Sequence, residues 1–208
     1  MRVAVLFEKS GIVRDAYLAL GHDAISCDFL PTERPGPHIE GDVLSFDWSS
    51  YDLVIAHPPC TAIAVSGNRY YANTPERQLA ADLIDRVWSI PVARLCIENP
   101  VGQINRYLPH FPRPQYIQPW QFGHPESKKT GLWKRNLPHL LPTDILPLPS
   151  CGYWNNQTPT GQNKLGPSPD RASIRSRTYP GIATAMATQW STAEPDDNHH
   201  PQNERSNA

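Results

Sequence analysis

The sequence lacks long hydrophobic runs, and none of its apolar stretches approaches the roughly 18 residues that a membrane-spanning helix needs. Its first residues also lack the small-residue cleavage site of a signal peptide, because the apolar opening runs directly into Glu8 and Lys9. From these two absences we expect a cytoplasmic protein without a membrane partner.

Cysteine is scarce and has no paired spacing, so the chain does not predict a disulfide framework. The four cysteines are Cys27, Cys60, Cys96 and Cys151. The first and third fall in apolar runs and are expected in the core as thiols. His57 and Cys60 could form half of a zinc site. However, the other candidates (His110, His124, His139 and Cys151) supply no second ligand pair of recognised spacing, and we predict no metal.

The chain also lacks a strong overall charge, but its net charge of −1 hides an asymmetry. Residues 1–100 carry 8 Lys and Arg against 13 Asp and Glu, a net of −5. Residues 101–180 carry 10 against 3, a net of +7. A basic region beside an acidic one favours a polyanionic partner such as nucleic acid. The plainer alternative is a solvated surface that happens to be basic.

Strand and helix signals alternate along the first hundred residues. Apolar runs predict strands at Val3 to Phe7, Ala24 to Asp28, Tyr51 to Ala56 and Arg94 to Ile97. Helical spacing predicts one helix that opens at Ser10-Gly11 and closes at Gly21, and another at Pro75 to Trp88. The alternation predicts an α/β fold with a mostly parallel sheet and helices on both faces.

Beyond Asn99 the chain becomes rich in proline, with 13 of its 23 prolines between Pro109 and Pro180. Two aromatic-rich runs there, Gln115 to Phe122 and Lys128 to Trp133, predict an antiparallel hairpin, and Ile182 to Trp190 predicts a helix. We expect one domain over residues 1–190, with an irregular basic segment at 134–175. The polar tail, 191–208, is expected to be disordered.

Chemically distinctive residues follow the predicted strands. Carboxyl ends of parallel strands meet at one edge of a sheet, where ligands bind. The segments that would meet there are Phe7-Glu-Lys-Ser-Gly11, Cys27-Asp28, Gly41-Asp42, His57-Pro-Pro-Cys60 and Glu98-Asn-Pro100. Asp28 lies about 20 residues beyond the first turn, a spacing at which a carboxylate commonly binds a ribose. Gly11 would let the backbone approach a ligand closely.

These motifs resemble those of the DNA cytosine-5 methyltransferases, which have Pro-Pro-Cys after one strand, Glu-Asn-Pro after the next and an FxxSG-type first turn. Three longer stretches, FEKSGIVRDAYLALGHDAISCDFLPTE, QPWQFGHPESKKTGLW and NKLGPSPDRASIRSRTYPGIATAMATQW, look like the compact phage and prophage members. The resemblance covers the chain from Met1 to Trp190. It implies a Rossmann-like methyltransferase fold, S-adenosylmethionine as cofactor, and a bacterial or phage-infected cytoplasm.

The residue types suit that reaction. Cytosine C5 is a poor nucleophile. A thiolate that adds to C6 converts the ring to an enamine, and C5 of this enamine can accept a methyl group. Cys60 is therefore the candidate nucleophile, and Glu98 the general acid at N3, with a pKa that must rise for this role. Amino-group methyltransferases have an aromatic residue after the double proline. A thiol cannot stack on a base but can attack it, which favours carbon methylation. The alternative is that Cys60 merely fills a tight turn.

The resemblance also implies roles for other residues. Lys128 and Thr130 stand where the family has a Gln-x-Arg-x-Arg segment, a departure that bears on how strongly the target base is activated. The implied cofactor-binding residues are Phe7, Glu8, Ser10, Gly11, Asp28, Asp42 and Pro58. The implied substrate-binding residues are Pro59, Asn99, Pro100, Lys129, Lys164, Arg171, Arg175 and Arg177.

The segment from Lys134 to Arg175 is too short for the separate recognition domain of full-length relatives. We therefore expect a short target sequence, or help from a partner chain or homodimer. Duplex DNA would need its cytosine flipped out of the stack. Two alternatives stay open: the same chemistry on RNA or a free cytosine nucleotide, and an inactive nucleic-acid-binding homologue.

Overall fold

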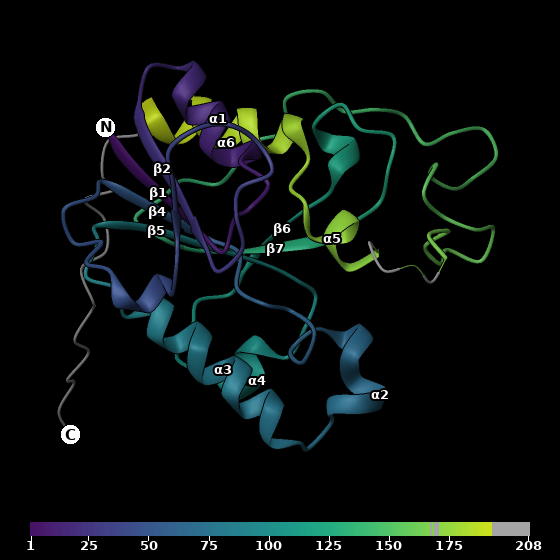
Figure 1. The fold of residues 1–208 in the computed structure, drawn as a ribbon. Coiled ribbons are helices and arrows are strands. Elements are labelled where there is room, and N and C mark those ends of the chain that lie inside the picture. Colours follow the sequence, from purple (N-terminus) through teal and green to yellow (C-terminus); the bar gives the residue numbers. More distant parts are fainter. Residues whose placement is uncertain (167, 169–170, 193–208) are drawn as a thin grey trace, which may run out of the picture.

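Seven strands form one sheet in the computed structural model, which describes residues 1–166, 168 and 171–192 (Figure 1). The strands are β1 (Arg2–Leu6), β2 (Asp23–Asp28), β3 (His38–Glu40), β4 (Leu53–Ala56), β5 (Arg94–Pro100), β6 (Gln115–Ile117) and β7 (Thr130–Arg135). Their order across the sheet is β3-β2-β1-β4-β5-β7-β6. The first five are mutually parallel, whereas β7 runs antiparallel to both β5 and β6. The predicted parallel sheet with an antiparallel hairpin is confirmed.

The strand order reverses between β1 and β4, which are neighbours in the sheet although two strands separate them in the sequence. At such a switch point the loops that follow the two strands leave toward opposite faces, and a crevice opens outside the carboxyl ends. The loops that follow β1 and β4 carry Ser10-Gly11 and His57-Pro-Pro-Cys60.

Helices cover both faces of the sheet (Figure 1). They are α1 (Ile12–Ala19), α2 (Asn68–Tyr71), α3 (Pro75–Trp88), α4 (Ile104–Tyr107), α5 (Arg171–Ser176) and α6 (Pro180–Thr192). The buried side chains of α1 and α6 pack on one face, and those of α3 and α4 on the other. Alternate residues of β1 and β4 enter the two cores, which explains why both strands are apolar throughout. Among the described residues, no helix is long and apolar enough to cross a bilayer.

The structure corrects several predicted boundaries. Phe7 lies outside β1 because it has a φ of 58°, which extended chain does not adopt. The first strand of the hairpin ends at Ile117, and the 3₁₀ helix Pro119–Gln121 takes the place of its expected remainder. Strand β5 continues to Pro100 because its pairing with β7 extends that far. The predicted tail begins later than expected, since α6 runs to Thr192; its remainder, 193–208, lies outside the described residues.

The segment between β7 and α5 is irregular over its described part. Figure 1 shows it as a long excursion of loops beside α5. Trp120 and Trp154 anchor it by stacking in parallel, with ring centroids 5.7 Å apart. The irregular segment expected from the sequence, 134–175, overlaps the end of β7 and most of α5.

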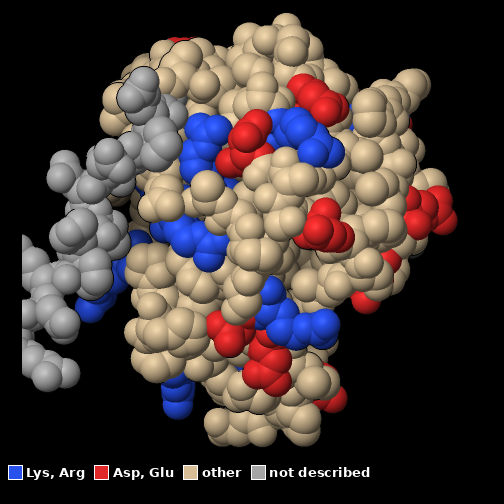
Figure 2. All heavy atoms as spheres, turned by 90° about the vertical axis from the view of Figure 1, so that its left-hand side faces the viewer, with Lys and Arg blue, Asp and Glu red and all other residues tan. Residues whose placement is uncertain are grey.

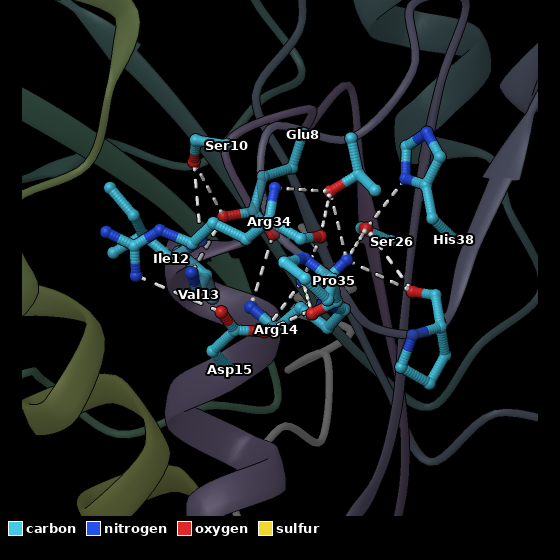
Figure 3. A network of polar contacts seen from close by, with 12 residues as sticks. Glu8, Ser10, Ile12, Val13, Arg14, Asp15, Ser26, Arg34, Pro35 and His38 are labelled. Carbon is cyan, nitrogen blue, oxygen red and sulfur yellow. Dashed lines mark hydrogen bonds and ion pairs between the residues drawn. The ribbon is translucent and has the colours of Figure 1, made fainter.

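A buried arginine on α1 holds together the loops after β1 and β2 (Figure 3). The side chain of Arg14 is fully buried and pairs with Asp15 at 2.8 Å. Its guanidinium donates hydrogen bonds to the hydroxyls of Ser26 and Thr32, and to the carbonyls of residues 34, 35 and 37. A guanidinium offers five donors in a fixed plane, so one side chain can fix the whole loop after β2.

Replacement of Arg14 by methionine should lower the free energy of unfolding by about 2–4 kcal/mol, because the fully buried guanidinium is lost and the loop after β2 loses several hydrogen bonds at once. Urea denaturation measures this change. Arg113→Met serves as the control, since Arg113 is exposed and its loss should change the unfolding free energy by less than about 0.5 kcal/mol. Equal stability of the two variants would contradict this role of Arg14.

Candidate active site

Hydrogen bonds tie the carboxyl ends of neighbouring strands into one edge. The amide of Glu8 donates to the carbonyl of Cys27, and that of His57 donates to Leu6. The side-chain amide of Asn99, at the end of β5, donates to the carbonyl of Pro58 at 3.0 Å. The segments that the sequence placed at this edge are therefore neighbours in the structure.

The double proline forms a rigid turn that presents Cys60. Pro58 is buried and Pro59 is exposed, and the thiol of Cys60 is half-buried. The carbonyl of Cys60 accepts hydrogen bonds from the amides of residues 63 and 64, which fixes the backbone on the far side of the turn. Proline restricts φ and lacks an amide hydrogen, so this turn can end a buried strand without leaving unpaired donors at two positions.

Glu98 is the central charged residue of the site. It is only 8% exposed, and its Oε2 lies 2.9 Å from Nδ1 of His57. Burial raises the pKa of the Glu98 carboxyl, but the hydrogen bond from His57, the charge of Lys128 and the hydroxyl of Thr130 outweigh burial and hold it below its ordinary value. The carboxylate is therefore ionised in the free protein. The expected rise of this pKa is not present in the free state and would have to accompany substrate binding.

The pKa of the Cys60 thiol is shifted in the opposite direction, above its ordinary value. Burial raises its pKa, and the negative charge of Glu98 raises it further. Lys128 and Arg175 act against these two effects without cancelling them. The thiol is consequently protonated at rest, and a nucleophilic role requires that it lose this proton when a substrate arrives.

Three of the four residues predicted to be catalytic line a small pocket. Glu98, Lys128 and Thr130 line it together with Ile117, Thr178, Tyr179 and Ile182. Lys128 donates from Nζ to the carbonyl of Arg177 at 3.2 Å, which ties the segment before α6 to the hairpin. Cys60 is electrostatically coupled to both Glu98 and Lys128. The structure thus brings Cys60, Glu98, Lys128 and Thr130 into one cluster.

The first turn has a more structural character than the sequence indicated. The carboxylate of Glu8 accepts hydrogen bonds from the amides of Val13 and Arg14 and from the hydroxyl of Ser10, so it caps α1. Gly11 has a φ of +68°, and a Cβ there would lie 2.5 Å from the guanidinium of Arg14. Only glycine fits this position.

Two carboxylates and an exposed aromatic ring lie at or just beyond the ends of β2 and β3. Asp28 and Asp42 each accept a hydrogen bond from the amide two residues further on, at 2.9 and 3.0 Å, which orients their side chains. Between them in the sequence, Phe29 is 64% exposed. Sequence reasoning missed Phe29, although its place directly after the acid was a usable signal.

The basic residues predicted to bind substrate divide into different environments. Arg177 pairs with Glu33 at 2.8 Å, and Lys164 and Lys129 lie over the rings of Tyr153 and Tyr116. Arg175 acts on the thiol of Cys60, which places it near the site. Figure 2 shows one outer face on which basic and acidic side chains intermingle, so that face does not present a single-sign patch.

The sequence assigns His57 no role of its own beyond half of a possible zinc site. Within the described part of the chain, no three His, Cys, Asp or Glu side chains are grouped closely enough to hold a metal ion. Instead, Nδ1 of the ring forms a hydrogen bond with Oε2 of Glu98. The other nitrogen, Nε2, is buried and has no hydrogen-bond partner among the described residues. The sequence could not reveal this pair because 41 residues separate its members.

No protein-family model matches the chain, and no curated protein matches it in sequence. Its fold is similar to solved structures of methyltransferases. One is a prophage-encoded E. coli protein described as a DNA modification methyltransferase (14% identity, TM-score 0.45, 71% of this chain and 52% of that one). The others are the Entamoeba histolytica methyltransferase EhMeth (15%, 0.47, 70% and 57%) and S. pombe Dnmt2 methyltransferase (16%, 0.44, 67% and 51%). The chain spans about half the length of these structures.

The raised pKa of the Cys60 thiol predicts slow alkylation by iodoacetamide at neutral pH, with a rate that increases as pH rises. Glu98→Gln removes the negative charge that contributes to the raised pKa, so alkylation of Cys60 at neutral pH should become several-fold faster. Mass spectrometry of the labelled peptides gives the rate for each cysteine. An unchanged Cys60 rate in the variant would show that the carboxylate does not act on the thiol.

Proposed function

We propose that the chain is a DNA cytosine-5 methyltransferase that uses S-adenosylmethionine and a covalent adduct at Cys60. One observation carries the proposal. A half-buried thiol is held by a double-proline turn beside a buried carboxylate and a lysine, at the switch point of a doubly wound sheet. A tight turn that only needed a small residue would not require an ionised carboxylate beside it.

The chain's own side chains supply the activation of the base. The thiolate of Cys60 adds to C6 of cytosine, and Glu98 in its protonated form gives a proton to N3, so that the ring becomes an enamine. The positive charges of Lys128 and Arg175 favour the thiolate, since both act to lower the pKa of Cys60. Lys128 thus supplies the positive charge that arginines supply at this position in the family that the chain resembles.

The loops after β1, β2 and β3 suit S-adenosylmethionine. The carboxylates of Asp28 and Asp42 can accept hydrogen bonds from a ribose and an adenine, and the exposed ring of Phe29 can stack on the base. Phe7, Ser10, Gly11 and Pro58 would contribute backbone and small side chains to the rest of the cleft. When bound, this cofactor supplies an electrophilic methyl group on a sulfonium.

Duplex DNA is the proposed acceptor. Arg175 on α5 is close enough to act on Cys60, so the basic segment borders the site rather than a distant surface. Phosphate contacts from such residues position the nucleic acid without reading its sequence. We place Pro59, Asn99, Pro100 and Lys129 around the flipped base, and Lys164 and Arg171 along the phosphates. The irregular loops before α5 are the part of the chain available for base contacts, alone or with a partner chain.

The proposed activity predicts transfer of labelled methyl from S-adenosylmethionine to unmethylated duplex DNA, with 5-methylcytosine as the product. Cys60→Ala should reduce transfer to background because the adduct cannot form, whereas Cys151→Ala, which removes an exposed thiol, should retain it. The measurement is chromatography of the labelled nucleosides after digestion.

Other outcomes assign other functions. If the label appears in RNA or in a free nucleotide and not in DNA, the acceptor is different but the proposed chemistry stands. Binding of cofactor and DNA without transfer would leave an inactive nucleic-acid-binding homologue. Transfer that survives Cys60→Ala would contradict the covalent mechanism.

The two arginines that flank the end of α5 should differ in their effect on DNA binding. Arg175→Ala should weaken binding and reduce the slope of log affinity against log salt by about 1, as expected for one lost phosphate contact. Arg177→Ala should change this slope less, because Glu33 already holds the Arg177 side chain. Fluorescence anisotropy at several salt concentrations gives both slopes, and equal slopes would contradict the distinction.

A further inference from the structure

We propose that Glu33 is a positioning residue. It joins the loops after β1 and β2 to the segment before α6, and through that segment it keeps the ammonium of Lys128 at the site of Cys60. The proposal rests on the function proposed above, which assigns the two loops to the cofactor and Lys128 to the activation of the thiol. It gives a role to a carboxylate that the proposed chemistry leaves unused.

The two carboxylate oxygens of Glu33 bind cations from two different parts of the chain. Oε1 lies 3.2 Å from Nζ of Lys9, in the loop after β1, and Oε2 lies 2.8 Å from Nη2 of Arg177, which directly follows α5. Burial raises the pKa of the Glu33 carboxyl, but the hydrogen bond from Lys9 and the charge of Arg177 outweigh burial and hold it below its ordinary value. The ionised carboxylate therefore links two segments that are far apart in the sequence.

The chain around Glu33 is itself well fixed. The backbone amide of Glu33 donates to the carbonyl of Lys9 at 2.7 Å. The hydroxyl of the neighbouring Thr32 accepts a hydrogen bond from the buried guanidinium of Arg14 at 3.2 Å, within the network that Figure 3 shows. The arginine that holds the loop after β2 therefore also fixes the place from which Glu33 reaches Arg177.

The other end of this connection is Lys128. The carbonyl of Arg177 accepts a hydrogen bond from Nζ of Lys128 at 3.2 Å, and the amide of Lys128 donates to Oε1 of Gln118 at 3.0 Å. The lysine is thus held at its backbone and at its tip. Without the contact at the tip, its flexible four-carbon stem would let the ammonium turn toward water. The charge of Lys128 acts on both Glu98 and Cys60, so both feel where this ammonium is held.

One line of contacts therefore runs from the proposed cofactor loops to the proposed nucleophile. It passes from Glu33 to Arg177 and from there to Lys128. Because Lys128 acts to lower the pKa of the Cys60 thiol, loss of the carboxylate should raise that pKa and slow the reaction of the thiol. The Glu33 and Arg177 side chains are 27% and 47% exposed, and a partly exposed ion pair supports an effect of about three- to fivefold.

Alkylation of Cys60 by iodoacetamide in the free protein tests the connection, because it does not depend on turnover. Glu33→Gln keeps the shape of the side chain and removes its charge, so the Cys60 rate at neutral pH should fall about three- to fivefold. Arg177→Gln should slow the reaction by the same factor, and the two substitutions together should slow it no further, as expected for two members of one pair.

Glu40→Gln is the matched control, because Glu40 is an exposed carboxylate at the end of β3, and its rate should equal that of the wild type. An unchanged Cys60 rate in Glu33→Gln would overturn the proposal, and so would effects of Glu33→Gln and Arg177→Gln that simply multiply in the double variant.

Two further comparisons separate positioning from general structural support. In a Lys128→Met background, Glu33→Gln should have no additional effect on the Cys60 rate, since the ammonium through which it acts is absent. Arg177→Lys retains a cation and should recover most of the rate that Arg177→Gln loses. Further slowing in the Lys128→Met background, or equal slowing by Arg177→Lys and Arg177→Gln, would overturn the proposal.

Failure of the proposed function would be recognised separately. A wild-type protein that transfers no methyl group to DNA would refute the proposed function alone, because the alkylation rates would still decide whether Glu33 acts on the thiol through Lys128.

Discussion

A carboxylate buried at the edge of the sheet imposes the arrangement of the site. Burial of an unpaired charge costs several kcal/mol, so Glu98 can stay ionised only if neighbouring segments supply compensating groups. They come from two directions: His57 directly follows β4, whereas Thr130 is the first residue of β7 and Lys128 lies two residues before it. The antiparallel β7 therefore does more than widen the sheet, because its pairing with β5 brings Thr130, and the segment that leads into it, beside the carboxylate.

The same compensation has a chemical consequence. Burial raises the pKa of the Cys60 thiol most, and the charge that His57, Lys128 and Thr130 stabilise on Glu98 raises it further. The resting cluster is therefore arranged against premature reaction of the cysteine. Protonation of Glu98, which its proposed role as the acid at N3 requires, removes that charge and makes the thiolate of Cys60 more favourable.

The sequence predicted best those helices and strands whose ends carry a local signal such as proline. Helix α3 spans Pro75–Trp88 as predicted, because proline and its apolar spacing define it locally, and the double proline marks the end of β4. The alternation of strands and helices also predicted that Cys60 and Glu98 lie at the same edge of the sheet, because β4 and β5 are parallel neighbours. The functions of these residues remain predictions.

Contacts between distant residues were not available from the sequence. The pairing of His57 with Glu98 and the tie between Arg177 and Glu33 depend on the tertiary fold, and neither has a spacing that a pattern could reveal. The resemblance implies that Glu8 binds the cofactor, whereas in the structure its carboxylate accepts hydrogen bonds from two amides at the start of α1. The depressed pKa of Glu98 depends on three residues that converge only after folding.

The most direct test of the account is to trap the adduct between Cys60 and a cytosine. Fluorine at C5 cannot leave as a proton does, so a duplex that contains 5-fluorocytosine should hold the protein covalently in the presence of S-adenosylmethionine. Digestion and mass spectrometry should then find the nucleotide on the peptide that contains Cys60. A cross-link at another residue, or no cross-link under conditions in which the protein methylates ordinary DNA, would contradict the account.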